Sequence, residues 1–272
     1  MSMIGRIALY SIVVLSLVAL SAIFVFLKLA PEGNLPAQLI QPKTLTTKTW
    51  GVFNPESGEI IAGNNLIEKR PIASLTKLFT ALAVMESTKQ HEQFTISQSD
   101  VNTEGRAGKL VYGEHMTPYE LLFPLLIESS NDAAEAIKRD LGSEYTDSVK
   151  RTLDKLSLSN TELHDASGLS KESVSTIQDL VRFFIYLRKT YPHLIDITQL
   201  RLYIDSRTGY VNNNPGRTFD TFTGGKNGYS EEAGRTFIGT FSFEDSEIGI
   251  ILLGSTDVTR DITELLSYGE GI

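Results

Sequence analysis

The chain has 272 residues, of which 41% are hydrophobic and 21% are charged, and its formal net charge at pH 7 is −8. This size and hydrophobic content suffice for one substantial core, which excludes a wholly disordered chain. The acidic balance, and the lack of a basic stretch interleaved with aromatic residues, argue against a nucleic acid partner. The sequence holds no cysteine, so disulfides, thiolate metal sites and cysteine nucleophiles are excluded together.

The chain begins with a long apolar stretch. Residues 7–26 contain no charged side chain, and a helix needs about 20 apolar residues to span a bilayer. A cleaved signal peptide is the alternative, but the following residues, FLKLAPEG, form a poor small-residue cleavage site. The prediction is an N-terminal membrane anchor or signal segment over residues 1–30, a linker with three prolines over 31–46 and one domain over 47–272.

The two ends of this domain predict β-structure. Residues 49–63, TWGVFNPESGEIIAG, contain two β-prone runs about a turn and indicate a hairpin. Residues 219–230, 235–243 and 248–256 are β-branched or aromatic runs separated by turn residues, which predict antiparallel strands. A helix over 261–269 is expected to close the chain.

The middle of the domain predicts helices. Thr117 is a favourable N-cap followed by proline, and Pro124 should kink or end the helix that starts there. A polar turn over 129–131 precedes a second helix that should stop near Gly142. Two further helices are expected, over 145–156 and 176–189. The predicted fold class is therefore α/β of the α+β kind: an antiparallel sheet formed by the N- and C-terminal strands, flanked by helices, with an inserted helical lobe.

One helix combines apolar residues with a serine and a lysine. The segment PIASLTKLFTALAVME, residues 71–86, places Ser74 and Lys77 three residues apart, on the same face of a helix. Burial of an amine disfavours its charged form, so the lysine could accept the serine proton and create a nucleophile. Backbone N–H groups at the helix start could stabilise an oxyanion. The spacing alone is common in chains of this length, so it needs partners.

Two further segments offer such partners. In the turn Ser129-Ser130-Asn131, a second hydroxyl could transfer a proton to a leaving group and an amide could hold a carbonyl, although these residues could equally cap a helix. In GGKNGYS, the glycines allow another backbone to approach the strand, and Lys226 could provide a fixed positive charge. A turn with a solvated lysine is the alternative there.

The three segments together resemble the motifs of the penicillin-recognising serine enzymes, which carry Ser-x-x-Lys, Ser-x-Asn and Lys-Thr-Gly. The chain resembles the D-alanyl-D-alanine carboxypeptidase family, the low-molecular-mass penicillin-binding proteins, over roughly residues 47–270. The stretches YGEHMTPYELLFPLLIESSNDAAEAI, DASGLSKESVSTIQDLVRF and GGKNGYSEEAGRTFIG carry the likeness beyond the short motifs. The resemblance implies the β-lactamase and DD-peptidase type of fold.

The resemblance also implies a function and a role for each site residue. The activity would be a serine-type D-Ala-D-Ala carboxypeptidase acting on peptidoglycan stem peptides through an acyl-serine intermediate. Ser74 would be acylated, Lys77 would be its base, and Ser129 would pass a proton to the leaving amine. The substrate-binding residues would be Asn131, Lys226, Asn227, Gly228 and Tyr229, with the N–H groups of Ser74 and Tyr229 forming the oxyanion hole.

Ligands, partners and location follow from the same resemblance. No metal or organic cofactor is required, and the four histidines show no ligand spacing. β-Lactams are expected as covalent inhibitors. The catalytic domain is expected on the extracytoplasmic side of the bacterial cytoplasmic membrane, tethered by a single N-terminal span; the oligomeric state is left open.

The sequence departs from the family at Asn227, where the third motif usually has threonine, and we expect altered specificity or slower acylation. The resemblance ends with the final helix, as in single-domain D,D-endopeptidases, which use the same serine chemistry on peptidoglycan cross-links. A catalytically impaired envelope-binding module of the same fold is a third interpretation. A serine β-lactamase is disfavoured, because Glu162 lacks the neighbouring asparagine that its water-activating glutamate requires.

Overall fold

The computed structural model describes residues 45–269 except 106–107, 206–207 and 244–245. The chain divides into two units, residues 1–41 and 42–272, and every described residue belongs to the second unit. The predicted N-terminal anchor or signal segment and nearly all of the linker lie outside the described residues. Within the described part of the chain, no helix is both long and apolar enough to cross a membrane.

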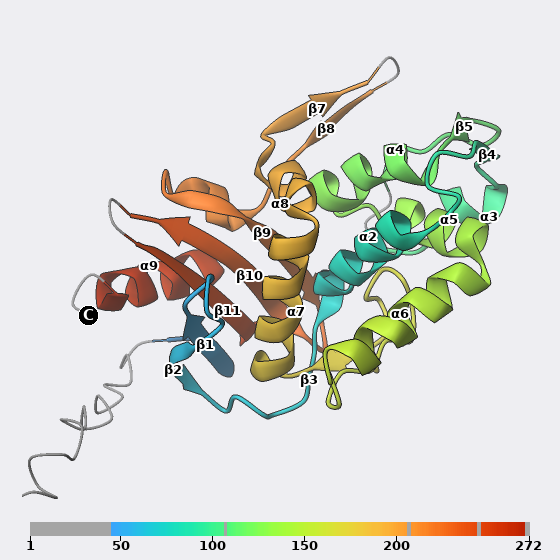
Figure 1. The fold of residues 1–272 in the computed structure, drawn as a ribbon. Helices are drawn as coiled ribbons and strands as arrows, with labels where there is room; N and C mark the ends of the chain where they lie inside the picture. Colours follow the sequence, from blue (N-terminus) through green and yellow to red (C-terminus); the bar gives the residue numbers. More distant parts are fainter. Residues whose placement is uncertain (1–44, 106–107, 206–207, 244–245, 270–272) are drawn as a thin grey trace, which may run out of the picture. The chain divides into compact units, whose positions relative to one another are not determined.

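The central element is a five-stranded antiparallel sheet with the strand order β2-β1-β11-β10-β9 (Figure 1). Its strands are β1 (Thr49–Phe53), β2 (Ile60–Asn64), β9 (Phe222–Ser230), β10 (Gly234–Ser242) and β11 (Glu247–Ser255). The N-terminal hairpin joins the C-terminal strands through β1 and β11, where Trp50 lies opposite Leu252. The predicted hairpin, the three late strands and the joining of the two ends in one sheet are confirmed.

Helices cover both faces of this sheet, because the side chains of each strand alternate between two apolar clusters. On one face, Phe237 and Leu252 belong to a cluster with Ile262 of α9 (Val258–Gly269). On the other face, Ile238 and Ile251 belong to the larger cluster, which includes Phe184 of α7 (Ile177–Thr190). Figure 1 shows α9 and α7 on opposite sides of the strands.

The segment between β2 and β9 contains the helical lobe that the sequence predicts. Its main helices are α2 (Thr76–Glu86), α4 (Pro118–Phe123), α5 (Asn131–Leu141), α6 (Ser143–Lys155) and α7. Thr117 caps α4 through a reciprocal capping box with Glu120, and α4 ends at Phe123, directly before Pro124. A single π-helical turn, η2 (Pro124–Glu128), then leads to the polar turn before α5. The predicted cap and the effect of the proline are both confirmed.

Several short elements have too few residues to show a period in the sequence. The most prominent is the hairpin β7–β8, which projects at the top of Figure 1 after helix α8. The short elements are η1 (Ala73–Leu75), η3 (Pro215–Thr218), α3 (Gln98–Val101), α8 (Pro192–Gln199), β3 (Arg70–Pro71), β4 (Phe94–Thr95), β5 (His115–Met116), β6 (Val174–Ser175), β7 (Leu202–Ile204) and β8 (Gly209–Val211).

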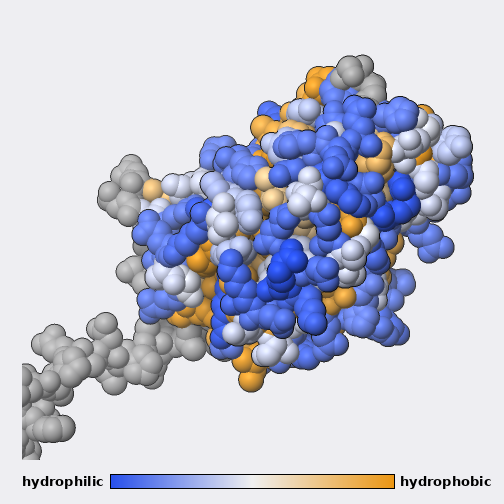
Figure 2. Space-filling model, turned by 45° about the vertical axis from the view of Figure 1, so that its right-hand side comes forward, coloured by the Kyte–Doolittle hydropathy of each residue, from blue (hydrophilic) through white to orange (hydrophobic). Residues whose placement is uncertain are grey.

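The surface view in Figure 2 shows one face of the molecule, on which hydrophilic residues predominate and apolar residues form scattered patches. Among the large apolar side chains, Ile67 and Ile204 are the most exposed in the described residues, at 69% and 67%. Ile204 shares the β7–β8 hairpin with Leu202 and Val211, which are each 47% exposed, so exposed apolar side chains gather on that hairpin. Most of the buried apolar side chains belong to the two clusters that flank the sheet.

Candidate active site

Ser74 lies in a tight turn that leads into a buried helix. It is the middle residue of η1, and α2 begins two residues later. The preceding residue, Ala73, has a φ of 45°, a conformation that costs free energy for any residue with a Cβ and is frequent at functional sites. This turn leaves Ser74 half-buried while Lys77, in the first turn of α2, is fully buried.

Lys77 is surrounded by three oxygen atoms. Its Nζ lies 3.0 Å from Ser74 Oγ, 2.7 Å from Asn131 Oδ1 and 2.6 Å from the backbone oxygen of Ser167. The amide and backbone oxygens can only accept hydrogen bonds, whereas the serine hydroxyl can also donate one. A neutral amine would donate its two N–H groups to Asn131 Oδ1 and to the backbone oxygen of Ser167, and direct its lone pair at the Ser74 hydroxyl. The geometry therefore suits transfer of the Ser74 proton to Lys77.

The turn between η2 and α5 presents the second hydroxyl. Ser129 has a left-handed backbone, with a φ of 65°, and its Oγ accepts a hydrogen bond of 2.8 Å from Lys226 Nζ. Ser130 is the residue that caps α5, since its Oγ accepts from the N–H of Ala133. Asn131 is the first residue of α5 and donates from its Nδ2 to the backbone oxygen of Glu104. The cap and the candidate site residues are thus different members of one turn.

The edge strand β9 forms the opposite side of the site. Lys226 is buried and directs its Nζ to Ser129 and to the backbone oxygen of Asn227. A Cβ at Gly228 would lie 2.6 Å from the backbone nitrogen of Ser74, so only glycine lets the strand approach the nucleophile this closely.

Of the eight predicted site residues, hydrogen bonds join Ser74, Lys77 and Asn131 into one group and Ser129 and Lys226 into another. Residues 129 and 131 belong to the same turn, so the two groups are adjacent. Because strand side chains alternate, those of Asn227 and Tyr229 lie on the other face of β9 from Lys226. Tyr229 is 64% exposed, and the guanidinium of Arg235 lies over its ring.

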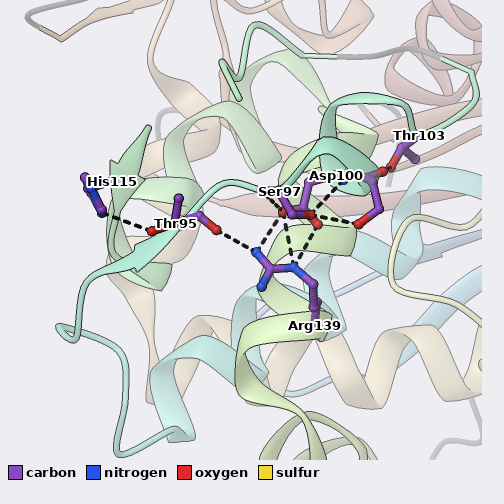
Figure 3. A network of polar contacts seen from close by, with 7 residues as sticks. Thr95, Ser97, Asp100, Thr103, His115 and Arg139 are labelled. Carbon is purple, nitrogen blue, oxygen red and sulfur yellow. Dashed lines mark hydrogen bonds and ion pairs between the residues drawn. The ribbon is translucent and has the colours of Figure 1, made fainter. Parts of the chain in front are cut away.

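A charged network joins α3 to α5, the helix that begins with Asn131 (Figure 3). Arg139, two turns further along α5, forms a bidentate pair with Asp100 of α3, with Nε–Oδ1 and Nη2–Oδ2 distances of 3.0 and 2.7 Å. Burial raises the pKa of the Asp100 carboxyl, but hydrogen bonds from Arg139 and from Ser97 outweigh this effect and hold the pKa below its ordinary value. The pair fastens α3 to α5, a few residues before Glu104, the acceptor of the Asn131 amide.

Two contributions to the site were missed by reasoning from the sequence. The backbone oxygen of Ser167 is an acceptor for Lys77. The type of side chain at a position does not predict that its backbone oxygen will contact the site. Asp132 accepts a hydrogen bond of 2.7 Å from the N–H of Gly108, which ties a second segment to the start of α5. The resemblance of the stretch DASGLSKESVST to the family was the available signal for the first of these.

Comparison with known proteins agrees with this geometry. The family model described as D-alanyl-D-alanine carboxypeptidase matches residues 37–256. A D-alanyl-D-alanine endopeptidase of Haemophilus influenzae is 28% identical over 234 residues, which cover 79% of this chain and 78% of the relative.

Solved structures show the same fold. The crystal structure of a D-alanyl-D-alanine carboxypeptidase from Mycobacterium tuberculosis is 24% identical, with a TM-score of 0.79 and coverage of 87% of this chain and 96% of that one. Penicillin-binding protein D2 from Listeria monocytogenes, in its cefotaxime-bound form, is 25% identical, with a TM-score of 0.73 and coverage of 84% and 97%. By its sequence match and its fold, the chain belongs to the D-alanyl-D-alanine carboxypeptidase family of serine peptidases.

Proposed function

We propose that this member of the family removes the terminal D-alanine from peptidoglycan stem peptides through an acyl-enzyme on Ser74. The observation that carries the proposal is the set of three oxygen atoms around Lys77 Nζ. The oxygens of Asn131 and Ser167 can only accept hydrogen bonds, so of the three groups only the Ser74 hydroxyl can give a proton to the amine. This is the geometry that an amine needs to act as a general base.

In the acylation step, Ser74 Oγ transfers its proton to Lys77 Nζ and attacks the carbonyl carbon between the two D-alanines. The oxyanion that forms is placed to accept hydrogen bonds from the backbone N–H groups of Ser74 and Tyr229. The close contact at Gly228 supports this, because it brings the outer edge of β9 beside the nucleophile.

In the leaving step, the C–N bond breaks and the departing amine takes a proton from Ser129. Lys226 holds that hydroxyl at 2.8 Å and makes it a better proton donor by its positive charge. Proton transfer from Lys77 to Ser129 then restores the hydroxyl, and water hydrolyses the ester to free Ser74. Asn131 positions the substrate and Lys77 together, while Lys226 attracts the terminal carboxylate.

The first experiment treats residues 42–272 with a fluorescent penicillin and with a peptide ending in Lys-D-Ala-D-Ala. The wild type should give a covalent adduct by intact mass and should release D-alanine, while Ser74→Ala should do neither. An unlabelled wild type that also leaves the peptide intact would refute the proposal in favour of a binding module. Defined cross-linked muropeptides in the same assay measure any endopeptidase activity.

β-Lactams are proposed as inhibitors of this chain, supported by the cefotaxime-bound relative in the family fold. We propose that Asn227 affects how well they fit, because a substrate that lies along the free edge of β9 can meet side chains from both faces of that strand, and the Asn227 amide replaces a smaller hydroxyl there. The rate of acylation should therefore depend on the size of the substituent next to the carboxylate of the drug.

The location is proposed from the apolar stretch over residues 7–26. We propose that it tethers the domain to the cytoplasmic membrane with the catalytic side outside, where peptidoglycan lies. Carbonate-washed membranes should retain the full chain and lose a chain that starts at residue 42. Protease added to intact spheroplasts should cleave the domain; protection from that protease would contradict the topology.

A further inference from the structure

A loop outside the three motifs determines where Lys77 points. Residues 165–173, DASGLSKES, are here named the lysine-facing loop, and the backbone oxygen of Ser167 in this loop accepts from Lys77 Nζ at 2.6 Å. This is the shortest of the three contacts of that amine given above. A shift of the loop would therefore move an oxygen that accepts from an N–H group of Lys77.

One carboxylate holds the lysine-facing loop in shape. Asp165 Oδ2 accepts from Ser167 Oγ at 3.0 Å, from Leu169 N at 2.6 Å and from Ser170 N at 3.1 Å. Its Oδ1 accepts from Ser173 Oγ at 2.7 Å. All four of these contacts of Asp165 are to its own loop, three at Oδ2 and one at Oδ1; Ser167 Oγ also lies 3.2 Å from Glu135 Oε1.

The same loop contacts the turn that carries the nucleophile. The N–H of Ile72 donates to the backbone oxygen of Ser173 at 3.0 Å. Gly168 has a φ of +82°, and a Cβ there would lie 1.9 Å from the backbone oxygen of Ala73. On α2, Thr80 Oγ1 donates to the backbone oxygen of Ala166 at 2.7 Å. The loop therefore packs without spare space against both ends of the Ser74–Lys77 pair.

We propose that Asp165 is a positioning residue, which holds the Ser167 carbonyl against Lys77 and so keeps the lone pair of the amine directed at Ser74. Asp165 acts through the loop and touches neither substrate nor the reacting atoms. The inference rests on the proposed function of Lys77 as the base, and it adds a residue that none of the three motifs contains.

The effect on pH dependence has a definite sign. A carbonyl acceptor stabilises the protonated amine more than the neutral one, because a charged donor makes the stronger hydrogen bond. Loosening the Ser167 carbonyl should therefore let Lys77 lose its proton at a lower pH. It should also lower the maximal rate, since the neutral amine is no longer oriented. A variant that merely contained less folded protein would scale the rate and leave the pH profile in place.

The test measures the rate of acylation by a fluorescent penicillin against pH for Asp165→Ala, Asp165→Asn and a matched control. Asparagine keeps one acceptor oxygen, so Asp165→Asn should fall between wild type and alanine. The control is Glu172→Ala, which removes an exposed carboxylate from the same loop. For Asp165→Ala we expect a maximal rate lower by about tenfold, the equivalent of about 1.4 kcal/mol, and an acid limb displaced to lower pH.

Two outcomes would contradict the positioning role of Asp165, and a third would contradict the proposed function. An acid limb that stays in place in Asp165→Ala, with a rate reduced only in proportion to the folded fraction by circular dichroism, would overturn the positioning role. The same holds if Glu172→Ala shifts the profile as much. If the wild type itself forms no adduct with the penicillin and releases no D-alanine, the proposed function fails and the inference falls with it.

Discussion

The helical lobe and the sheet each contribute one buried lysine to the site, and their surroundings differ. Lys77, on α2, meets oxygen atoms from three separate parts of the chain, namely η1, α5 and the lysine-facing loop. Lys226, on β9, meets the hydroxyl of Ser129 and the backbone oxygen of its own neighbour Asn227. Two of these contacts of Lys77 reach segments distant in sequence, whereas those given for Lys226 combine one distant hydroxyl with a backbone oxygen of its own strand.

This difference indicates two uses for the same functional group. Three separate tethers set the direction of Lys77, and direction matters for a proton acceptor. Lys226 needs only to place a positive charge near Ser129 and the substrate carboxylate, and charge is less sensitive to orientation than a lone pair is. Changes at Lys77 should therefore affect chemistry, and changes at Lys226 should affect mainly the binding of anions.

The largest effect is expected from Lys77→Ala. Without the amine, the Ser74 hydroxyl has no base, and loss of general-base catalysis typically costs about 10²- to 10⁴-fold in rate. We expect the acylation rate by penicillin to fall within that range, with little change in the apparent affinity for the intact drug. Stopped-flow fluorescence separates the two quantities. A variant that binds the drug poorly but is acylated at a normal maximal rate would contradict the assignment of Lys77 as the base.

A smaller and different effect is expected from Lys226→Ala. Removal of the cation takes away attraction for the carboxylate and the partner of Ser129, so both affinity and rate should fall, by about 10- to 100-fold together, equivalent to about 1.4–2.8 kcal/mol. A peptide with an amidated C-terminus should lose much less than one with a free carboxylate. Equal losses for both peptides would mean that Lys226 acts only through Ser129.

Arg139→Ala should affect the surroundings of Lys77 more than those of Lys226. The change leaves the buried Asp100 carboxylate without its bidentate partner, which should cost about 2 kcal/mol, the range for hydrogen bonds to charged groups. Chemical denaturation at neutral pH measures this loss. Acylation should slow more than the binding of anions does, because Asn131, the acceptor for Lys77, lies on the same helix.

The pH dependence of this loss follows from the lowered pKa of Asp100. A group with a depressed folded-state pKa stabilises the fold above its unfolded pKa, which is about 3.9 for aspartate, and this contribution is lost as the pH falls through the folded value. The wild type and Arg139→Ala should therefore differ in unfolding free energy at pH 7 and converge in acid. A constant difference down to pH 2 would show that the ion pair is not the cause.

Tyr145 predicts the opposite pH behaviour in the same lobe. Burial raises the pKa of its hydroxyl to about 12, so the folded state holds the proton more tightly than the unfolded state does. Its contribution is complete below about pH 10, the ordinary value for tyrosine, and is lost as the pH rises toward the folded value. Thermal melts of Tyr145→Phe between pH 8 and 11 should show a shallower alkaline decline than the wild type.

The long, regular elements were predictable from the sequence because period and capping residues define them locally. Thr117 with Glu120 marked the start of α4, and the glycine-punctuated strands at the end of the chain marked the meander. The start of α9 was placed three residues too late, at 261 instead of Val258. Helices α3 and α8 and the β7–β8 hairpin were not anticipated, since segments this short take their conformation from what they pack against.

The site divides in the same way. Ser74 and Lys77 were candidates from their spacing of three residues, because one helical turn brings such residues together, although Ser74 lies in η1 and Lys77 in the following α2. The contact between Lys226 and Ser129 joins residues 97 positions apart, so only the resemblance to a family brought them together. The Ser167 carbonyl had no periodic signal and belongs to none of the three short motifs, because a backbone oxygen is present at every position; only the likeness of the stretch DASGLSKESVST to the family pointed to this segment.

The smallest effect is expected from Asn227→Thr, which restores the usual residue of the third motif. The backbone oxygen of residue 227 already accepts from Lys226, and this contact does not depend on the side chain. The change should therefore leave the Lys226–Ser129 contact intact and alter only the side chain that we propose to lie near the substrate carboxylate. Threonine also has the stronger β-propensity, on a scale that spans about 1 kcal/mol. We expect acylation to rise by about two- to fivefold, corresponding to about 0.4–1 kcal/mol, for a substrate with a free carboxylate. An amidated substrate should show no gain, and an equal gain for both would place the effect in the strand itself and not in recognition of the anion.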